Sequence, residues 1–437
     1  MNDIIAAIAT PPGLGGVGIV RVSGPNLGDF VTQVAGSIPE ARRARLLTLR
    51  DEEGNAMDSG LVLYFPAPAS FTGEDVVEFH GHGGPVVMQL VLDVMLAAGA
   101  RRAGPGEFTR RAFDNNKLDL AQAEAIADLI ASGTEEAARA ALRSLSGEFS
   151  ARVHALVEAL TQIRIYVEAA IDFPDEDIDF LSDAALTQRL DGAREAFVSL
   201  LESTRGGRLL RDGFNVVIAG KPNAGKSSLM NALSGDDTAI VTAIAGTTRD
   251  VLRETINLDG VLVELVDTAG LRDDAGEIEE EGIRRARRAM ESADAIIWLV
   301  DDQNPDDTAP AEDIPVIRAF NKVDASGGTI GTRDDGSIGL SATTGDGLDS
   351  LKQKIGQLAG VGQTGEGTFT ARQRHIDAID SAQTHFELGV QHLLTAQAGD
   401  LLAEELRLAQ RDLGLITGEL PADELLGRIF ADFCIGK

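Results

Sequence analysis

The amino-acid sequence predicts a multidomain fold with an N-terminal α+β domain, a discontinuous helical bundle, and an α/β domain with a mainly parallel sheet inserted into that bundle. Three observations predict it. Short β-branched runs mark residues 1–117, helical periodicity marks residues 118–211 and 367–437, and strands alternate with helices over residues 212–366. At roughly 100–200 residues per domain, 437 residues suffice for two to four domains with separate cores.

The first domain has the pattern of a strand-rich α+β structure. Residues 18–22, 60–65 and 75–79 are β-branched runs bounded by glycine and proline. Residues 86–98 have helical character. We therefore expect a sheet with at least one helix packed on it.

Two helical parts flank the inserted domain. Apolar residues recur at helical spacing within residues 118–130 and 153–163. A further helical run covers residues 370–413, a short helix covers residues 423–430, and residues 360–368 have the composition of a linker. Because a complete α/β pattern interrupts the helical one, we expect one bundle with an insertion where exposed chain ends lie close together.

The charge balance limits the kinds of partner. The chain has 39 Lys and Arg against 69 Asp and Glu, a formal net charge of -30, and residues 212–366 alone carry -14. Proteins that bind nucleic acid non-specifically usually present a basic face, because affinity grows with the number of phosphates neutralised. Non-specific nucleic-acid binding is therefore disfavoured, and an RNA role must rest on local shape or on a partner.

Cysteine use and apolar patterning indicate the compartment. One cysteine in 437 residues excludes an intramolecular disulfide framework and is typical of a reducing environment. No apolar run reaches the roughly 18 residues of a membrane helix, and Asp3 stands where a signal peptide would carry Lys or Arg. We therefore expect a cytoplasmic protein with no membrane segment.

The strongest motif is a phosphate-binding loop. Residues 220–227, GKPNAGKS, match G-x-x-x-x-G-K-[ST] between a strand expected at 214–218 and a helix expected at 228–233. Glycines let backbone N–H groups point at phosphates, and the helix N-terminus adds partial positive charge. Lys226 is expected to reach the β- and γ-phosphates and Ser227 to bind Mg²⁺, as in a Ras-like P-loop domain.

A second motif identifies the base. Asn321-Lys322-Val323-Asp324 follows an apolar strand expected at 316–320. The Asp324 carboxylate suits the two N–H donors on the guanine edge, which adenine lacks. The backbone of Ser341 and Ala342 is expected near the guanine O6. These features favour GTP and oppose a P-loop ATPase or kinase.

The hydrolytic motifs lack one group. Asp267-Thr268-Ala269-Gly270 follows a strand expected at 261–266 and suits Mg²⁺ and the γ-phosphate, and Thr248 is the expected switch threonine on Mg²⁺. Leu271 comes next, where Ras-like GTPases carry a glutamine that orients the attacking water. Leucine has no polar group for that task, so the catalytic group must come from elsewhere.

The sequence resembles one family over nearly its whole length. The strings GKPNAGKSSLMNAL, IVTAIAGTTRD, DTAGLR, NKVD and the C-terminal CIGK are similar to those of the MnmE (TrmE) family of tRNA-modifying GTPases. So are IAAIATPPG, GIVRVSG and SFTGEDVVEFHGHGGP in the first domain. The resemblance implies a GTPase coupled to modification of C5 of the wobble uridine of tRNA.

The same resemblance implies a potassium-dependent homodimer in which two GTPase domains meet. K⁺ would be held by Asn223, Thr242, Ile244 and Thr247, and Glu279 would orient the hydrolytic water. A monovalent cation can stabilise transition-state charge where an arginine finger otherwise would. The nucleotide site given by the motifs and the resemblance comprises Gly220, Asn223, Ala224, Gly225, Lys226, Ser227, Ser228, Thr242, Ala243, Ile244, Ala245, Gly246, Thr247, Thr248, Asp267, Thr268, Ala269, Gly270, Asn321, Lys322, Asp324, Ser341, Ala342 and Thr343.

Folate chemistry is implied for the first domain, which would also carry the dimer contact. Arg21, Glu78, Lys117 and Lys437 would surround 5,10-methylenetetrahydrofolate or 5-formyltetrahydrofolate, with basic groups on the glutamyl carboxylates and Glu78 on pterin donors. Cys434 would be either a catalytic thiol or an apolar filler. The implied partners are tRNA and an MnmG-like FAD-dependent protein, in a heterotetramer or larger complex.

One alternative function is a regulatory GTPase of the ribosome-assembly type, with the helical bundle as its effector platform. Such proteins usually carry a basic RNA-binding domain, and no segment here is net basic. Two local patterns are also discounted. Residues 13–18 fit G-x-G-x-x-G but precede a strand, unlike a Rossmann site. His80-Gly81-His82 is expected in a glycine-rich turn rather than at zinc.

Overall fold

The computed structural model describes residues 3–51, 53–172, 184–235, 253–258, 260–267, 293–305, 314–360, 368–419, 423–431 and 433–436. The chain divides into two compact units. One unit combines Met1–Ala127 with Gly414–Lys437, and the other is Asp128–Leu413. The boundaries expected at residues 117, 211 and 366 divide the chain into more parts than these two units. They stay predictions.

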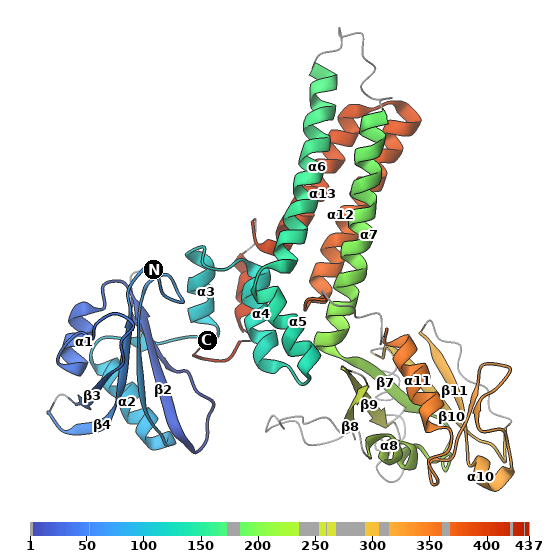
Figure 1. The fold of residues 1–437 in the computed structure, drawn as a ribbon, viewed down its shortest axis with the longest axis horizontal. Helices are drawn as coiled ribbons and strands as arrows, with labels where there is room; N and C mark the ends of the chain where they lie inside the picture. The colour runs from blue at the N-terminus through green and yellow to red at the C-terminus, as the bar shows by residue number, and fades with distance from the viewer. Residues whose placement is uncertain are drawn as a thin grey trace, which may run out of the picture. The chain divides into compact units, whose positions relative to one another are not determined.

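The first unit is built on a six-stranded sheet (Figure 1). Its strands are β1 (Ile5–Ile8), β2 (Gly15–Gly24), β3 (Arg45–Arg50), β4 (Ala56–Phe65), β5 (Asp75–Gly83) and β6 (Arg101–Arg102). Their order across the sheet is β3-β4-β5-β2-β1-β6. Neighbours run antiparallel except β1 and β6, which are parallel.

Helices cover both faces of this sheet. They are α1 (Gly28–Ala35) and α2 (Pro85–Ala97) on one side and α3 (Glu107–Asp114) on the other. Val20 and Val22 belong to the core with α1 and α2, whereas Ala7 packs with Phe108 of α3. Because successive strand residues alternate between faces and Arg21 pairs with Ala7, Arg21 projects on the α3 side.

The C-terminal residues also belong to the first unit. Helix α14 (Asp423–Ala431) packs Leu426, Ile429 and Phe430 against Leu120 and Ala123 of α4 (Leu120–Ala131). This packing anchors the end of the chain within the same unit as the N-terminal sheet.

The second unit contains a bundle of long helices, which lie alongside one another in Figure 1. They are α6 (Glu148–Asp172), α7 (Ala184–Asp212), α12 (Gln373–Ala396) and, as far as Leu413, α13 (Gly399–Thr417), with the shorter α5 (Glu135–Leu145) nearby. Phe197 of α7 and Phe386 of α12 have ring centroids 5.4 Å apart. Arg164 of α6 donates to Gln410 of α13 at 2.6 Å. Segments from before and after the inserted domain thus share one bundle.

A second sheet forms the inserted α/β domain. Its elements are β7 (Phe214–Ala219), α8 (Lys226–Ser234), β8 (Arg253–Leu258), β9 (Val261–Asp267), β10 (Ala295–Asp301), β11 (Val316–Asn321), α10 (Val323–Ser326), β12 (Gly331–Thr332), β13 (Ile338–Gly339) and α11 (Leu348–Leu358). The strand order is β12-β13-β11-β10-β7-β9-β8. The five central strands are parallel, and β8 and β12 run antiparallel at the edges. The carboxyl ends of the parallel strands meet at one edge, where ligands bind in α/β sheets.

The expected fold class is confirmed, with one local correction. The helical segment expected at 370–413 consists of two helices, α12 and α13, because Gln397 adopts φ +50° and ends α12. His80-Gly81-His82 lies in β5 rather than in a turn, because β2 and β4 pair with β5 on either side. Among the described helices, none combines the length and apolarity needed to cross a bilayer.

Candidate functional site

The loop between β7 and α8 adopts a conformation that requires glycine at two points. Gly220 has φ +147° and Gly225 has φ +95°. A Cβ at Gly220 would lie 2.2 Å from the Leu299 carbonyl oxygen, and one at Gly225 would lie 2.3 Å from Asn321 Nδ2. The close approach of this loop to β10 and β11 therefore explains both glycines of the motif.

Lys226 places a positive charge inside this loop. It is buried at the start of α8, and its Nζ donates to the carbonyl oxygens of Gly220 and Lys221, both at 3.0 Å. Ala224 is also buried, whereas Asn223, Ser227 and Ser228 are exposed. A buried ammonium and the N-terminus of α8 at one loop make a setting for a polyphosphate.

Asn321 ties the phosphate-binding loop to the second loop of the expected nucleotide site. Its Nδ2 donates to the Ala224 carbonyl oxygen at 2.8 Å, and its Oδ1 accepts from the Ala342 N–H at 3.0 Å. The side chain is almost fully buried. The expected phosphate and base contacts, about 100 residues apart in sequence, are thereby joined through one amide.

The other residues of the base-recognition segment lie beside Asn321. Lys322 adopts φ +70°, and its Nζ lies 2.6 Å from Asp301 Oδ2. This contact holds the pKa of the Asp301 carboxyl below its ordinary value. Asp324 is exposed in α10. Ser341 is buried, and its Oγ accepts from the N–H of Thr343 at 3.3 Å.

Part of the expected site falls outside the described residues. Asp267 ends β9, next to β7. Outside the described ranges lie Thr242, Ala243, Ile244, Ala245, Gly246, Thr247, Thr248, Thr268, Ala269, Gly270, Glu279 and Lys437. For potassium, only Asn223 of the four expected ligands is described.

In the first unit, Arg21 and Glu78 lie directly opposite each other on β2 and β5. Arg21 Nε is 2.9 Å from Glu78 Oε1, and His80 Nε2 is 3.0 Å from Glu78 Oε2. The Arg21 guanidinium also lies 5.6 Å from the Phe71 ring centroid and 5.8 Å from that of Phe108. An arginine, a carboxylate and two aromatic rings thus converge on the α3 side of the sheet.

Lys117 approaches the same loop that carries Phe71. Its Nζ donates to the Pro68 carbonyl oxygen at 3.1 Å, and a Cβ at Gly73 would lie 3.2 Å from Lys117 Cγ. Lys117 and Arg21 therefore both contact residues 68–73. Two of the four expected folate residues therefore meet at one loop, and Glu78 joins them through its ion pair with Arg21.

The C-terminal tail lies against the start of α3. Ile435 forms an isolated β-bridge with Pro105, and the Gly106 N–H donates to the Cys434 carbonyl oxygen at 3.4 Å. Cys434 is exposed, so its expected alternative as a buried filler is wrong. Phe108, whose ring lies beside Arg21, is in this same helix.

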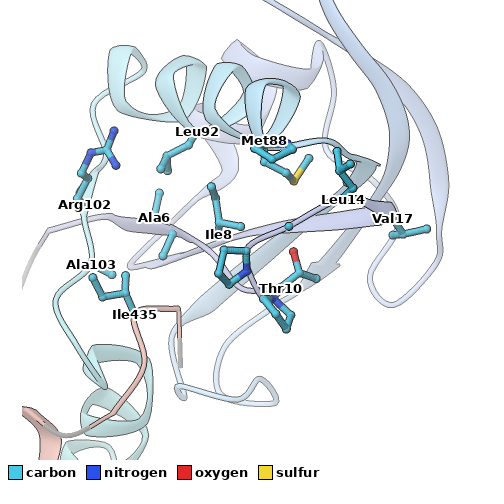
Figure 2. Close-up of a pocket in the computed structure, with 17 residues that line it drawn as sticks. Ala6, Ile8, Thr10, Leu14, Val17, Met88, Leu92, Arg102, Ala103 and Ile435 are labelled. Atoms are coloured by element: carbon cyan, nitrogen blue, oxygen red, sulfur yellow. The ribbon is translucent and has the colours of Figure 1, made fainter. Parts of the chain in front are cut away.

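A cavity of about 630 Å³ opens elsewhere in the first unit (Figure 2). Its wall is largely apolar, with Ile8, Leu14, Met88 and Leu92 among the lining residues and Ile435 of the tail on one side. Arg21, Glu78 and Lys117 do not line it. The cavity is therefore separate from these three expected folate residues.

Sequence reasoning missed the groups that hold the expected site residues in place. It assigned no partner to Lys322 and none to Glu78, whereas the structure gives Asp301 and His80. For Asp301 a signal exists, because it ends an apolar strand beside β11 and carboxyl ends of parallel strands share one edge. For His80 a signal also exists, because Glu78 and His80 are two residues apart in a strand and their side chains therefore lie on the same face. The neighbouring glycines favoured a turn instead.

The fold and the loops at the sheet edge define a class of protein. A parallel sheet that carries a glycine-rich phosphate loop and an Asn-Lys-x-Asp segment joined by Asn321 is a P-loop GTPase domain, here inserted into a helical bundle.

Comparison with known proteins gives the family. The family model described as "GTP-binding protein TrmE N-terminus" matches residues 4–117, and the family model described as "MnmE helical domain" matches residues 120–434. The tRNA modification GTPases MnmE of two Yersinia pseudotuberculosis strains, PB1/+ and IP32953, are each 53% identical over 451 residues, covering 100% of this chain and 99% of theirs. This chain belongs to the MnmE (TrmE) family, and it is a GTPase.

Solved structures resemble parts of the chain. The G domain of the T. maritima FeoB iron transporter is 26% identical, with 33% of this chain and 98% of that chain covered and a TM-score of 0.25. A variant of Aquifex aeolicus Era bound to GDP and AlF4⁻ is 20% identical, with 47% and 89% covered and a TM-score of 0.26.

Proposed function

We propose that this chain is a potassium-activated GTPase that modifies C5 of the wobble uridine of certain tRNAs, using a tetrahydrofolate one-carbon unit and an MnmG-like FAD-dependent partner. The observation that carries the proposal is 53% identity over the full chain to relatives named as tRNA modification GTPases. The proposal includes a cytoplasmic homodimer that joins its partner in a heterotetramer or larger complex.

In the GTPase domain, each residue has a proposed task. Lys226 and the loop N–H groups bind the phosphates, Asp324 reads guanine, and Glu279 orients water. Ser227 and Thr248 would hold Mg²⁺, and Asn223, Thr242, Ile244 and Thr247 would hold K⁺. The bound cations would stabilise charge that develops on the phosphates. The exposed position of Asn223 at the loop surface supports its role, since a cation there can also meet residues of a second GTPase domain.

In the first unit, the proposed folate site lies around Arg21, Glu78, Lys117 and Lys437. The donor set fits a folate derivative, because Glu78 can accept from a pterin amino group and the basic side chains can bind carboxylates. The Arg21–Glu78 pair supports this assignment, since it holds both groups in place and partly exposed beside aromatic rings. Cys434 is proposed as a catalytic thiol on the tail that approaches α3.

Nucleotide choice tests the GTPase part. Asp324→Asn replaces an acceptor-only carboxylate with an amide, so GTP affinity should fall by about two orders of magnitude and xanthosine triphosphate should become the preferred nucleotide. Titration with fluorescent GTP and XTP analogues measures both affinities. Unchanged GTP affinity would refute the role of Asp324.

Potassium dependence tests the cation part. Turnover in KCl should exceed turnover in NaCl at equal ionic strength by about tenfold or more, because the cation replaces a catalytic side chain. Asn223→Ala should remove this preference while nucleotide affinity changes little. Equal rates in the two salts for the parent protein would contradict the proposal. Mass spectrometry of wobble uridines from a deletion strain tests the tRNA part independently.

A further inference from the structure

We propose that Asp302 is a positioning residue for guanine recognition, because it holds residues 321–326 at both ends and so fixes the direction of the Asp324 carboxylate. This inference rests on the proposed role of Asp324. Asp302 follows β10 directly and belongs to none of the nucleotide-binding motifs.

The first attachment is through the backbone. The Asp302 N–H donates to the Asn321 carbonyl oxygen at 2.9 Å, at the point where β11 ends. Asn321 is already fixed through its side chain to Ala224 and Ala342. Asn321, the first residue of the segment 321–326, is therefore held by both main-chain and side-chain contacts.

The second attachment is through the carboxylate. The Ser326 hydroxyl donates to Asp302 Oδ2, and Ser326 Oγ accepts from the Gly328 N–H at 3.1 Å. The Ser326 N–H donates to the Lys322 carbonyl oxygen at 3.1 Å, which closes the turn that carries Asp324. Asp324 thus stands on a short turn whose last residue is bonded to Asp302.

Asp302 is itself held firmly. Its Oδ1 lies 2.8 Å from Arg333 Nη2, and its side chain is only 10% exposed. Burial raises the pKa of the Asp302 carboxyl, but the hydrogen bonds from Ser326 and Arg333 outweigh it and leave that pKa below its ordinary value. The Arg333 guanidinium lies 4.5 Å from the Phe320 ring centroid. Asp302 is therefore an ionised carboxylate fixed against the strand that leads into the recognition segment.

The contact between Ser326 and Asp302 is tightly packed against Gly328. A Cβ at Gly328 would lie 2.2 Å from Asp302 Oδ2. The neighbouring Asp301 holds Lys322 in the same way that Asp302 holds Ser326. Two successive carboxylates at the end of β10 therefore fix the residues on either side of Val323-Asp324.

Because the guanine base does not change during hydrolysis, loss of Asp302 should affect nucleotide binding rather than the chemical step. Asp302→Ala should weaken binding of a fluorescent GTP analogue by about tenfold and raise KM far more than it lowers kcat. Ser326→Ala removes the same contact from the other side and should weaken binding by about threefold. Asp334 is an exposed carboxylate beside Arg333. Asp334→Ala is therefore the matched control and should leave the affinity for the GTP analogue unchanged.

A double-mutant cycle distinguishes positioning from general destabilisation. If Asp302 acts through Asp324, then Asp302→Ala and Ser326→Ala should each change affinity less than about twofold once Asp324→Ala is present. Equal effects in both backgrounds would overturn the inference, as would parental affinity in Asp302→Ala. An Asp324→Ala variant with parental GTP affinity would overturn the proposed role of Asp324 and this inference with it. If Asp302→Ala does not fold, the double-mutant cycle of Ser326→Ala and Asp324→Ala tests the inference instead. Equal effects of Ser326→Ala with and without Asp324→Ala would then overturn it.

Discussion

At the residue scale, Arg111 organises the charged groups of the first unit. Its side chain is 3% exposed, and its guanidinium contacts Asp3 and Glu74 at 2.9 Å and Glu107 at 3.3 Å. Glu107 in turn accepts from Arg101 and from the Gly104 N–H, both at 2.8 Å. Removal of Arg111 would leave these three carboxylates without their buried counter-charge, whereas removal of one carboxylate takes away a hydrogen-bonded ion pair.

The acid stability of this unit should depend on Glu107. Burial raises the pKa of its carboxyl, but Arg101, the Gly104 N–H and Arg111 outweigh it, so that the pKa lies below its ordinary value. The carboxylate therefore stabilises the fold at neutral pH, and this contribution is lost as pH falls through the folded-state pKa. Glu107→Gln should lower the unfolding free energy at pH 7 by about 1–3 kcal/mol and reduce its loss towards pH 4.

Urea unfolding at pH 7 and pH 4, with pulse proteolysis of the first unit as the readout, measures both effects. Glu40→Gln breaks an exposed pair with Arg43 and serves as the control, with an expected change near zero. An identical pH profile for Glu107→Gln and the parent would show that this carboxylate carries no acid-linked stability.

At the element scale, most strands and helices were predictable because their signals are local. The strand expected at 214–218 is β7, and the helix expected at 86–98 is α2, displaced by one residue at each end. Misses arose where tertiary contacts override local pattern. Gly81 lies within strand β5 next to the side chains of Asp58 and Phe79, and a Cβ there would lie 2.3 Å from Asp58 Oδ2. The sequence carries no signal for this side-chain packing.

The side-chain contacts that connect separate helices could not be predicted from the sequence either. Asp128, near the end of α4, accepts at one oxygen from Arg211 Nε at 2.8 Å and from Arg372 Nη2 at 2.9 Å. Arg211 lies in the last turn of α7 just before β7, and Arg372 is the N-cap of α12. One buried carboxylate therefore holds both chain segments that lead into and out of the inserted domain.

Asp128→Asn should loosen both connections. It removes the negative charge that Arg211 and Arg372 share, while Arg211 keeps its contact with Asp212, so we expect the bundle to lose about 1–3 kcal/mol of stability. Hydrogen exchange should increase in the last turn of α7 and the first turn of α12, and less elsewhere. Asp191→Asn, in an exposed pair with Arg194, is the matched control. Exchange that increases uniformly over the bundle would argue against a local tie.

At the scale of the whole molecule, the two ends of the chain meet within one unit. Residues 434 and 435 contact residues 105 and 106, and a Cβ at Gly436 would lie 2.4 Å from the Ile8 carbonyl oxygen. The sequence predicts that a tail with folate residues must return to an N-terminal domain, but motif spacing cannot say whose. The structure places the described tail on the N-terminal domain of its own chain.

Deletion of residues 434–437 should therefore separate two activities. Phe433 stays packed in the core with α14, and the phosphate-binding loop belongs to the other unit, so folding and GTP hydrolysis should remain close to parental. Folate binding should weaken by about tenfold through loss of the Lys437 ammonium, and tRNA modification should be lost. Equilibrium binding of 5-formyltetrahydrofolate and mass spectrometry of wobble uridines measure the two losses. Full-length Cys434→Ser is the matched variant, since it keeps the charge and removes the thiol. Parental folate binding without modification in Cys434→Ser would assign chemistry to the sulfur, whereas parental modification by the truncated chain would reduce the tail to packing and refute the role of Lys437.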